Sequence, residues 1–408
     1  MTLELLVPEQ RSIALHELTA LIDAFPPPAS PFAGEIVEFC AELSQAIFHH
    51  REAAAYPELT ALAYWMRRSE LVRLREQFVS LGGAEKVLSP RGVVFHLPPG
   101  NVDTIFVYSW LMAILTGNRN VLRLSRHRAP AADLLVRLLR ERAQQAPEAV
   151  RGSTLVVSYG HEVEITSAVS SRCDVRVIWG GDDTVSLIRQ VPLPPHAREL
   201  TFPDRASLSV VRAEAYVALD AEGRRGLARQ FFNDAYWFDQ MACSSPRLVV
   251  WRGSPEETEA ASALFWTELA SHARERSYDP GAAARMEKLV FACRQIIDRD
   301  AAAYRREGET SVLRLRAMAE SPTQHCGAGM FLEARLDSLH ELVPALRRRD
   351  QTLTHFGFSA AELRELALEL RGRAIDRMVP IGQALQFHRL WDGCDLLAEF
   401  CRSVHIVA

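Results

Sequence analysis

Cysteine patterns that would indicate a disulfide-stapled or zinc-binding protein are missing from this chain. Its 408 residues contain seven cysteines, an odd number, with no CxxC pair and no Cys/His spacing of the zinc type. We therefore expect neither a disulfide framework nor a structural zinc site, and we assign no metal ligands. This cysteine usage fits a reducing compartment and predicts a cytoplasmic protein.

Long apolar runs and a surplus of positive charge are also missing. No apolar stretch reaches the roughly 18 residues that would cross a bilayer. The longest, around Ile105–Leu115, is interrupted by Tyr108 and Ser109. Residues 1–4 lack the basic start of a signal peptide, and no apolar core follows them. The net charge of −4 argues against a general nucleic-acid binder. We therefore expect neither a membrane span nor a nucleic-acid partner.

What is present predicts an α/β protein of two domains. The composition, 48% hydrophobic and 24% charged, is that of a globular chain. Residues 1–85 look mostly helical, with a helix over 57–81. From 91 to about 230, strands alternate with helices, which predicts a doubly wound, Rossmann-like sheet. The expected strands are 93–97, 121–124, 154–158, 175–179 and 208–211, the helices 107–115, 130–145, 162–170 and 183–189.

A βαβ unit is expected over residues 91–125, where a strand, a Pro/Gly turn, an apolar helix, a Gly-Asn turn and a second strand follow one another. Asn101 comes just past the carboxyl end of the first strand, which is where open α/β sheets bind ligands. Beyond residue 230 a second α/β region is expected, with long charged helices at 255–276 and 281–307.

Cys243 follows a helical-looking segment, residues 231–238, and precedes an apolar strand, residues 248–251. A thiol at such a junction can face a cleft while the elements on either side are buried. Small residues beside it let a substrate carbonyl approach and leave backbone N–H groups to face it, as acyl transfer requires. A buried structural cysteine is the alternative interpretation of this window alone. Together with Asn101, Cys243 offers a nucleophile and an amide donor for a tetrahedral intermediate.

Four short motifs follow one another along the chain. They are Pro98-Pro99-Gly100-Asn101, Gly117-Asn118 leading into Arg123-Leu124-Ser125, Gly180-Gly181, and Cys243-Ser244-Ser245-Pro246. In this order they resemble the aldehyde dehydrogenase superfamily. More narrowly, residues 239–246, 179–182 and 376–382 with 391–393 resemble the acyl-CoA reductase family typified by the fatty-acid reductase of bacterial luminescence. The resemblance covers roughly residues 85–408.

The resemblance implies an aldehyde-dehydrogenase-like fold, in which a Rossmann-like cofactor domain is joined to a second α/β catalytic domain. It divides the chain into an N-terminal helical region over 1–85, a dinucleotide-binding domain over 86–230, a catalytic domain over 231–372 and a C-terminal return segment over 373–408. Superfamily resemblance also suggests a homo-oligomer.

The cofactor residues are also implied by the resemblance, since no G-x-G-x-x-G fingerprint follows the first strand. Gly180 and Gly181 open a helix whose free N–H groups could face a pyrophosphate; an ordinary strand-to-helix turn is the alternative. Arg123 and Ser125 stand where related enzymes hold the adenosine ribose, with Lys in place of Arg123. An arginine there could pair with a 2′-phosphate, which favours NADPH and leaves NADH possible.

The implied reaction is reduction of an acyl thioester, from acyl-CoA or an acyl-carrier protein, to an aldehyde. The Cys243 thiolate takes the acyl group, the side chain of Asn101 and the Cys243 N–H stabilise the oxyanion, and a nicotinamide cofactor supplies hydride. Glu199 stands near the hydrolytic base of the oxidising members, but the Gly-Gly expected after it is replaced by residues 201–203. A surface role for Glu199 is the alternative.

Two other functions stay open. One is an NAD(P)-dependent aldehyde dehydrogenase that releases acid, against which the context of Glu199 argues. The other is a catalytically silent scaffold subunit of a reductase complex, against which the presence of both Asn101 and Cys243 argues. The acyl chain, the choice between CoA and a carrier protein, and the partner enzymes of such a pathway are not encoded in any motif.

Overall fold

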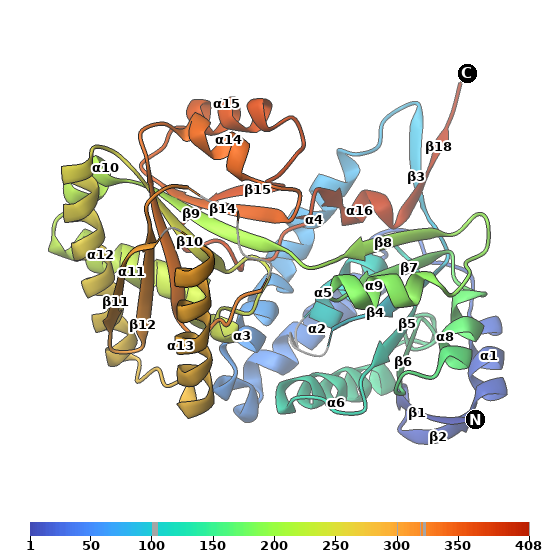
Figure 1. Ribbon diagram of the computed structural model, residues 1–408. Helices are drawn as coiled ribbons and strands as arrows, with labels where there is room; N and C mark the ends of the chain where they lie inside the picture. Colours follow the sequence, from blue (N-terminus) through green and yellow to red (C-terminus); the bar gives the residue numbers. More distant parts are fainter. Residues whose placement is uncertain (100–104, 300, 319, 321–323, 408) are drawn as a thin grey trace. The chain divides into compact units, whose positions relative to one another are not determined.

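The computed structural model describes residues 1–99, 105–299, 301–318, 320 and 324–407. They form two compact units, which Figure 1 colours along the sequence. The first unit contains residues 1–203 and 387–408, and the second contains residues 204–386. The first unit therefore takes in both ends of the chain.

The first unit is built on a seven-stranded sheet of order β2-β1-β6-β5-β4-β7-β8. Strands β4 to β8 run parallel, while β1 pairs antiparallel with β2 and with β6. Strands β6 and β7 are buried along their whole length, as parallel strands covered by helices on both faces are expected to be. The bounds are β1 Thr2–Val7, β2 Arg11–Ala14, β4 Val93–Leu97, β5 Arg119–Leu124, β6 Thr154–Ser158, β7 Val175–Trp179 and β8 Arg198–Phe202.

Helix α5 is buried along every residue because it packs against β4, β5 and helix α2. Its apolar character on all sides follows from that position. The other helical segments of the unit lie nearer the surface. The bounds are α1 Leu15–Asp23, α2 Gly34–His49, η1 Arg51–Ala55, α3 Pro57–Trp65, α4 Arg68–Val79, α5 Ile105–Leu115, α6 Pro130–Gln145, α7 Glu148–Arg151, α8 Val163–Ser170, α9 Asp182–Arg189 and α16 Leu396–Glu399.

The Gly117-Asn118 turn has a structural role. Gly117 has φ +86°, and a Cβ there would lie 2.1 Å from the carbonyl oxygen of Ala29, so only glycine fits. The buried Asn118 accepts hydrogen bonds from the backbone N–H of Gly92 at 3.0 Å and donates to the carbonyl of Phe400 at 3.0 Å. It thereby joins the start of β4 to the C-terminal residues, where β3 (Lys86–Pro90) pairs with β18 (Cys401–His405) and β16 (Leu390–Trp391) pairs with β17 (Cys394–Asp395).

The second unit has its own seven-stranded sheet, of order β11-β12-β13-β10-β9-β14-β15 and parallel except for the edge strand β11. Helices α10 to α12 cover one face with an aromatic core, and α13 to α15 cover the other. The bounds are β9 Ala206–Arg212, β10 Pro246–Arg252, β11 Ala301–Glu307, β12 Thr310–Leu315, β13 Met330–Leu336, β14 Asp350–Phe356, β15 Arg377–Pro380, α10 Ala213–Val217, α11 Ala221–Tyr236, η2 Trp237–Gln240, α12 Pro255–Glu275, α13 Gly281–Asp298, η3 Leu339–Glu341, α14 Leu342–Ala345 and α15 Ala360–Leu370.

The expected α/β class and its two sheets are confirmed, but three details of the prediction are wrong. Residues 1–85 are mostly helical, as expected, and also contain β1 and β2, which extend the first sheet. The helix expected over 57–81 is two helices, α3 and α4, and the one expected over 281–307 ends at Asp298 and is followed by β11. The strand expected at 208–211 belongs to the second sheet, because β9 lies between β10 and β14.

The division into units also differs from the expected domain ranges. The second unit begins at residue 204 and includes β9, ahead of the expected start at 231, and it keeps β15 at 377–380. Only residues from 387 onward return to the first unit. In the part of the chain that the structure describes, every helix is too short or too polar to cross a membrane.

Candidate functional site

The loop before Cys243 has an unusual backbone. Helix α11 ends at Tyr236, and the turn η2 follows it. Within this turn Phe238, Asp239 and Gln240 have φ values of 55°, 50° and 63°, in the left-handed region. Each such non-glycine residue costs roughly 1–2 kcal/mol. Strain of this kind persists where surrounding contacts impose it, and it is concentrated at functional sites.

The fully buried side chain of Gln240 holds this loop in place. Its Nε2 donates to the carbonyl of Pro246 at 2.9 Å, and its Oε1 accepts from the N–H of Gly329 at 3.1 Å. One residue earlier, the carbonyl of Asp239 accepts from the N–H of Ala328 at 2.8 Å. The loop is therefore tied both to the start of β10 and to the segment that leads into β13.

Cys243 lies between η2 and β10, so the expected helix-to-strand junction is confirmed. Cys243 is half-buried, whereas Ser244 and Ser245 are buried. The Cys243 carbonyl accepts a hydrogen bond from Ser207 Oγ at 2.7 Å, and Ser245 Oγ donates to the carbonyl of Asp234 at 2.8 Å. The backbone is fixed on both sides of a cysteine that keeps part of its surface exposed.

The buried carboxylate of Asp234 joins helix α11 to the chain after β15. It accepts from the N–H of Gly382 at 2.6 Å and from that of Ala384 at 2.9 Å. Burial raises the pKa of Asp234 to about 7, although the two N–H donors act in the opposite direction. Because Ser245 donates to the carbonyl of the same residue, Asp234 also supports the Cys243 loop.

Arg247 and His325 were not singled out by sequence reasoning. Arg247, four residues after Cys243 in β10, is half-buried, and burial lowers its pKa while the charge of a Cys243 thiolate raises it. His325 accepts at Nδ1 from the N–H of Gly327 at 2.9 Å, and burial, followed by the charge of Arg247, lowers its pKa to about 3. An arginine directly after Pro246, at the start of an apolar strand, was the available signal for Arg247.

The predicted cofactor residue Arg123 lies at the end of β5 in the first unit. Its Nη2 donates to the carbonyl of Gly160 at 2.5 Å, and its guanidinium lies 5.4 Å from the ring centre of Tyr159. Burial lowers the pKa of Arg123. Its Nε is buried and has no hydrogen-bond partner among the described residues. Arg123 thus keeps a donor for a further acceptor.

Gly180 and Gly181 open helix α9, as expected, with Gly181 at the N-cap. A Cβ on Gly180 would make a close contact of 3.1 Å with Thr184, and the N–H of Gly180 donates to the carbonyl of Phe202 at 3.2 Å. The first turn of α9 carries two aspartates, which disfavour an anion there. The N-terminus of α9 is therefore a weaker phosphate site than the sequence predicted.

The half-buried Ser125 follows β5 directly, and its Oγ accepts from the N–H of His127 at 3.3 Å. Strands β5, β4 and β7 are parallel neighbours, so the residues that follow β5 and β7 lie at one edge of the sheet. The predicted cofactor residues are thus brought to one edge. Asn101, predicted to follow β4, lies outside the described residues.

Glu199 has a structural explanation. Its carboxylate accepts from Arg176 at 2.5 and 3.0 Å and from Arg189 at 2.8 Å. Arg176 is buried, so Glu199 neutralises a guanidinium inside the first unit. A carboxylate held by two arginines is a poor general base. The alternative interpretation, that Glu199 is a surface residue, holds only in part, because Glu199 is half-buried.

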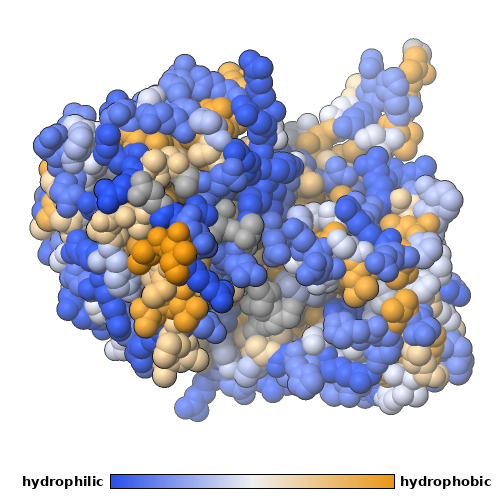
Figure 2. All heavy atoms as spheres, viewed as in Figure 1, coloured by the Kyte–Doolittle hydropathy of each residue, from blue (hydrophilic) through white to orange (hydrophobic). Residues whose placement is uncertain are grey.

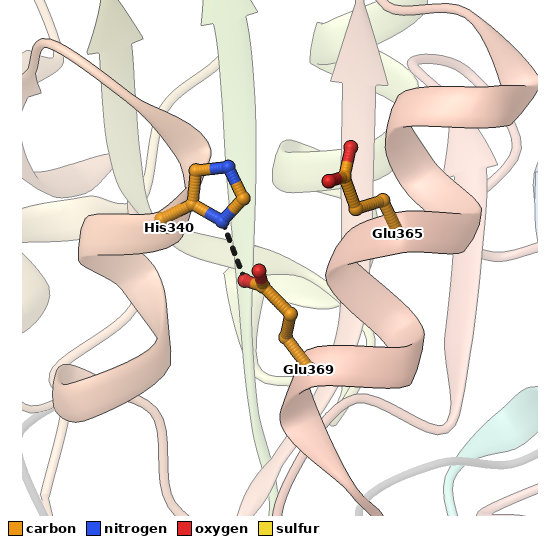
Figure 3. A group of neighbouring side chains, drawn as sticks. All are labelled: His340, Glu365 and Glu369. Atoms are coloured by element: carbon orange, nitrogen blue, oxygen red, sulfur yellow. Dashed lines mark hydrogen bonds and ion pairs between the residues drawn. The ribbon is translucent and has the colours of Figure 1, made fainter.

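His340, Glu365 and Glu369 form a surface group in the second unit, with one potential ligand atom of each within 4.8 Å of the others (Figure 3). His340 Nδ1 lies 2.6 Å from Glu369, and this contact raises the pKa of His340. The ion pair accounts for the arrangement, since His340 and Glu365 are exposed.

Comparison with known proteins assigns residues 83–403 to the acyl-CoA reductase (LuxC) family. The long-chain acyl-protein thioester reductase of Aliivibrio fischeri is 26% identical over 182 residues, which are 45% of this chain and 36% of that protein. That of Photorhabdus luminescens is 25% identical over 306 residues, 72% of this chain and 58% of that protein. The matched segments thus span between about a third and three-fifths of these relatives.

Solved structures with the same fold include the NAD⁺ complex of an aldehyde dehydrogenase from Bacillus cereus. It has a TM-score of 0.68 at 14% identity and covers 100% of this chain and 93% of that one. A mutant of aldehyde dehydrogenase C from Pseudomonas syringae, solved in complex with NAD⁺ and octanal, has a TM-score of 0.63 at 14% identity, with 97% and 85% covered. The aldehyde-dehydrogenase-like fold is therefore confirmed.

Proposed function

The chain belongs to the acyl-CoA reductase (LuxC) family, and we propose that it reduces an acyl thioester to an aldehyde through an acyl group held on Cys243. The observation that carries this proposal is the placement of Cys243. It is a half-buried cysteine on a fixed backbone, within the segment that matches the family. The curated relatives are thioester reductases by name.

In the proposed reaction, the Cys243 sulfur forms a bond to the acyl carbon, and the bond between that carbon and the carrier sulfur breaks. The carrier leaves as a thiolate and takes up a proton, and the chain holds the acyl group as its own thioester. When bound, a nicotinamide cofactor would supply the hydride that reduces this group to the aldehyde. The bond between the acyl carbon and the Cys243 sulfur then breaks, which returns Cys243 as a thiolate. We propose the Cys243 N–H and the Asn101 side chain as oxyanion donors, each worth about 3–4 kcal/mol.

NADPH is the cofactor we propose, with NADH as the alternative. One feature of the first unit fits NADPH: the buried Nε of Arg123 has no partner among the described residues and could donate to a phosphate oxygen. A guanidinium matches phosphate oxygens well. Ser125 would contact the ribose. Gly180 and Gly181 stay proposed pyrophosphate neighbours, with the N–H of Gly180 already engaged.

An acid-releasing aldehyde dehydrogenase is the second candidate, since such enzymes share the fold. Glu199 does not support it, because both carboxylate oxygens are held by arginines. A silent scaffold subunit is the third candidate. The substrate of the proposed enzyme is an acyl-CoA or acyl-carrier protein. Partner enzymes of the same pathway, a homo-oligomer and a cytoplasmic location are parts of this proposal.

The test is incubation with NADPH and a panel of acyl-CoAs, following the loss of NADPH absorbance and trapping the aldehyde. We expect Cys243→Ala to abolish turnover and the acyl adduct seen by intact mass, and to leave cofactor binding unchanged. Cys293→Ala is the matched control, because Cys293 is an exposed cysteine on α13. An acyl adduct on the Cys243→Ala protein would rule out this nucleophile.

A further inference from the structure

The inference concerns what ionises the Cys243 thiol, and it rests on the proposed role of Cys243 as the nucleophile. A thiol must lose its proton to attack, and a neighbouring positive charge promotes that loss. Arg247 interacts electrostatically with Cys243, and His325 and Cys326 in turn interact with Arg247. The contacts of each group within the second unit show which one can supply the positive charge.

Arg247 follows the Cys243 loop directly in the chain. It lies four residues after Cys243, in the strand whose first residue, Pro246, is fixed by the buried side chain of Gln240. Among the described residues the Arg247 side chain has no hydrogen bond or ion pair, and its Nε is buried. A half-buried guanidinium that makes no ion pair among the described residues is costly, so its retention points to an anion that forms in the reaction.

His325 cannot be that cation. Its Nδ1 accepts from the N–H of Gly327, so a neutral ring carries its proton on Nε2. Burial and then the charge of Arg247 lower its pKa to about 3, so it is uncharged near neutral pH. A cysteine–imidazolium pair between Cys243 and His325 is therefore not available. The neutral ring of His325 therefore adds no second positive charge beside Arg247.

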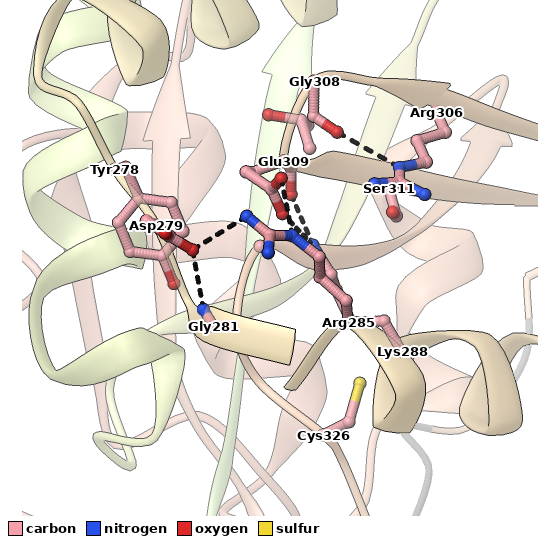
Figure 4. A network of polar contacts seen from close by, with 12 residues as sticks. Tyr278, Asp279, Gly281, Arg285, Lys288, Arg306, Gly308, Glu309, Ser311 and Cys326 are labelled. Atoms are coloured by element: carbon pink, nitrogen blue, oxygen red, sulfur yellow. Dashed lines mark hydrogen bonds and ion pairs between the residues drawn. The ribbon is translucent and has the colours of Figure 1, made fainter. Parts of the chain in front are cut away.

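Among the described residues, Cys326, Asp204 and Arg349 also act electrostatically on Arg247. Burial raises the pKa of Cys326 to about 11, so this thiol stays neutral and does not compete for the arginine. The nearby Lys288 is engaged elsewhere, as Figure 4 shows, with its Nζ donating to the carbonyl of Glu309 at 2.7 Å. Asp204 and Arg349 act on Arg247 in opposite directions.

Thermodynamic linkage gives the sign of the effect of Arg247 on the Cys243 thiol. Burial lowers the pKa of Arg247, and the Cys243 thiolate raises it. The interaction between the two groups is reciprocal, so the guanidinium must stabilise the thiolate by the same free energy. We propose that Arg247 is the cation that keeps Cys243 ionised for attack on the acyl thioester. Arginine suits this place because it stays charged when desolvated, whereas a buried lysine or histidine loses its proton.

The test measures the pH profile of Cys243 alkylation by iodoacetamide, read on the Cys243 peptide by mass spectrometry. Arg247→Gln should move the midpoint upward by about one pH unit or more. Arg247→Lys should move it less, and Arg294→Gln, which removes an exposed arginine from α13, should leave it unchanged. The melting temperature of Arg247→Gln should not fall, since the variant removes a guanidinium that lacks a partner.

A wild-type midpoint in folded Arg247→Gln would overturn the inference. If that variant does not fold, wild-type protein supplies the answer. Iodoacetate should then be favoured over iodoacetamide more at Cys243 than at the exposed Cys293, and high salt should weaken the preference. No such preference would also overturn it. A different result would overturn the proposed function itself: no acyl adduct on the wild-type chain by intact mass.

Discussion

At the residue scale, the Cys243 loop depends on polar side chains that bind backbone rather than one another. Gln240 uses both ends of its amide on main-chain groups, and Ser207 and Ser245 do the same with single hydroxyls. Because each of these bonds fixes a peptide unit, they determine where the Cys243 carbonyl and its neighbours point. These contacts involve main-chain groups of the loop and not the Cys243 thiol.

Asn101 is the proposed side-chain donor to the oxyanion. If its amide stabilises an oxyanion, Asn101→Ala should lower kcat by about 10²–10³ with little change in substrate binding. Asn101→Asp should be at least as harmful, because a carboxylate repels the developing charge. If Asn101 instead caps the helix that follows, the Asp variant should be nearly silent, since Asp is a good N-cap. Steady-state kinetics and thermal melts of both variants separate these outcomes.

Arg123 poses the same choice between binding and structure. If its guanidinium holds a 2′-phosphate, Arg123→Ala should raise the KM for NADPH much more than that for NADH. If its bond to the Gly160 carbonyl is its whole role, the variant should instead melt at lower temperature and affect both cofactors equally. Arg137→Ala, which removes a half-buried arginine that pairs with Glu52 from α6, is the control. The KM ratio is the quantity to measure.

At the scale of elements, Asp234 makes helix α11 sensitive to pH. Its pKa is raised by burial to about 7 in the folded chain, above the ordinary value of 3.8. Between about pH 4 and 7 the native state therefore binds more protons than the unfolded state, and this contribution to the free energy of unfolding falls as pH rises. Below pH 4 it is fully present, and above pH 7 it is lost.

Asp234→Asn should remove that slope. The difference in unfolding free energy between wild type and variant should decrease from pH 5 to 7.5 in urea titrations. Asp220→Asn is the matched control, because Asp220 is the exposed N-cap of the same helix and asparagine caps equally well. A pH-independent difference would show that Asp234 is ionised throughout this range.

The elements also show what the sequence could and could not predict. Strands β4, β6 and β7 have the predicted bounds because each is a short apolar run between turn residues. Strand β1 was missed, since its membership depends on pairing with β6, about 150 residues away. Cys243 was proposed from its local junction. Gln240, Asp234 and Arg247 were not, because their partners or electrostatic neighbours include residues remote in sequence.

At the scale of the whole molecule, the surface of the second unit carries an apolar stripe that the functional proposal does not use. Met286, Leu289, Val290 and Ile297 are exposed along helix α13, at spacings of three, four and seven residues. Figure 2 shows exposed hydrophobic residues gathered on the face it draws. Scattered apolar residues are normal on a surface, but a contiguous set at helical spacing is typical of an interaction face.

The whole chain, mixed with substrate but without its cofactor, should distinguish the three candidate functions. If Cys243 takes the acyl group and no base activates water, mixing the enzyme with excess acyl-CoA alone should release about one equivalent of free thiol per chain and then stop. An acid-releasing enzyme should keep turning over, because hydrolysis regenerates the thiol, and a silent scaffold should release none. Arginines hold Glu199, so we expect the acyl group to persist. Adding NADPH should then convert the stalled acyl group to aldehyde and restart thiol release, which quenched-flow sampling with a thiol reagent would measure. Continued thiol release without NADPH would contradict the reductase and favour the acid-releasing candidate.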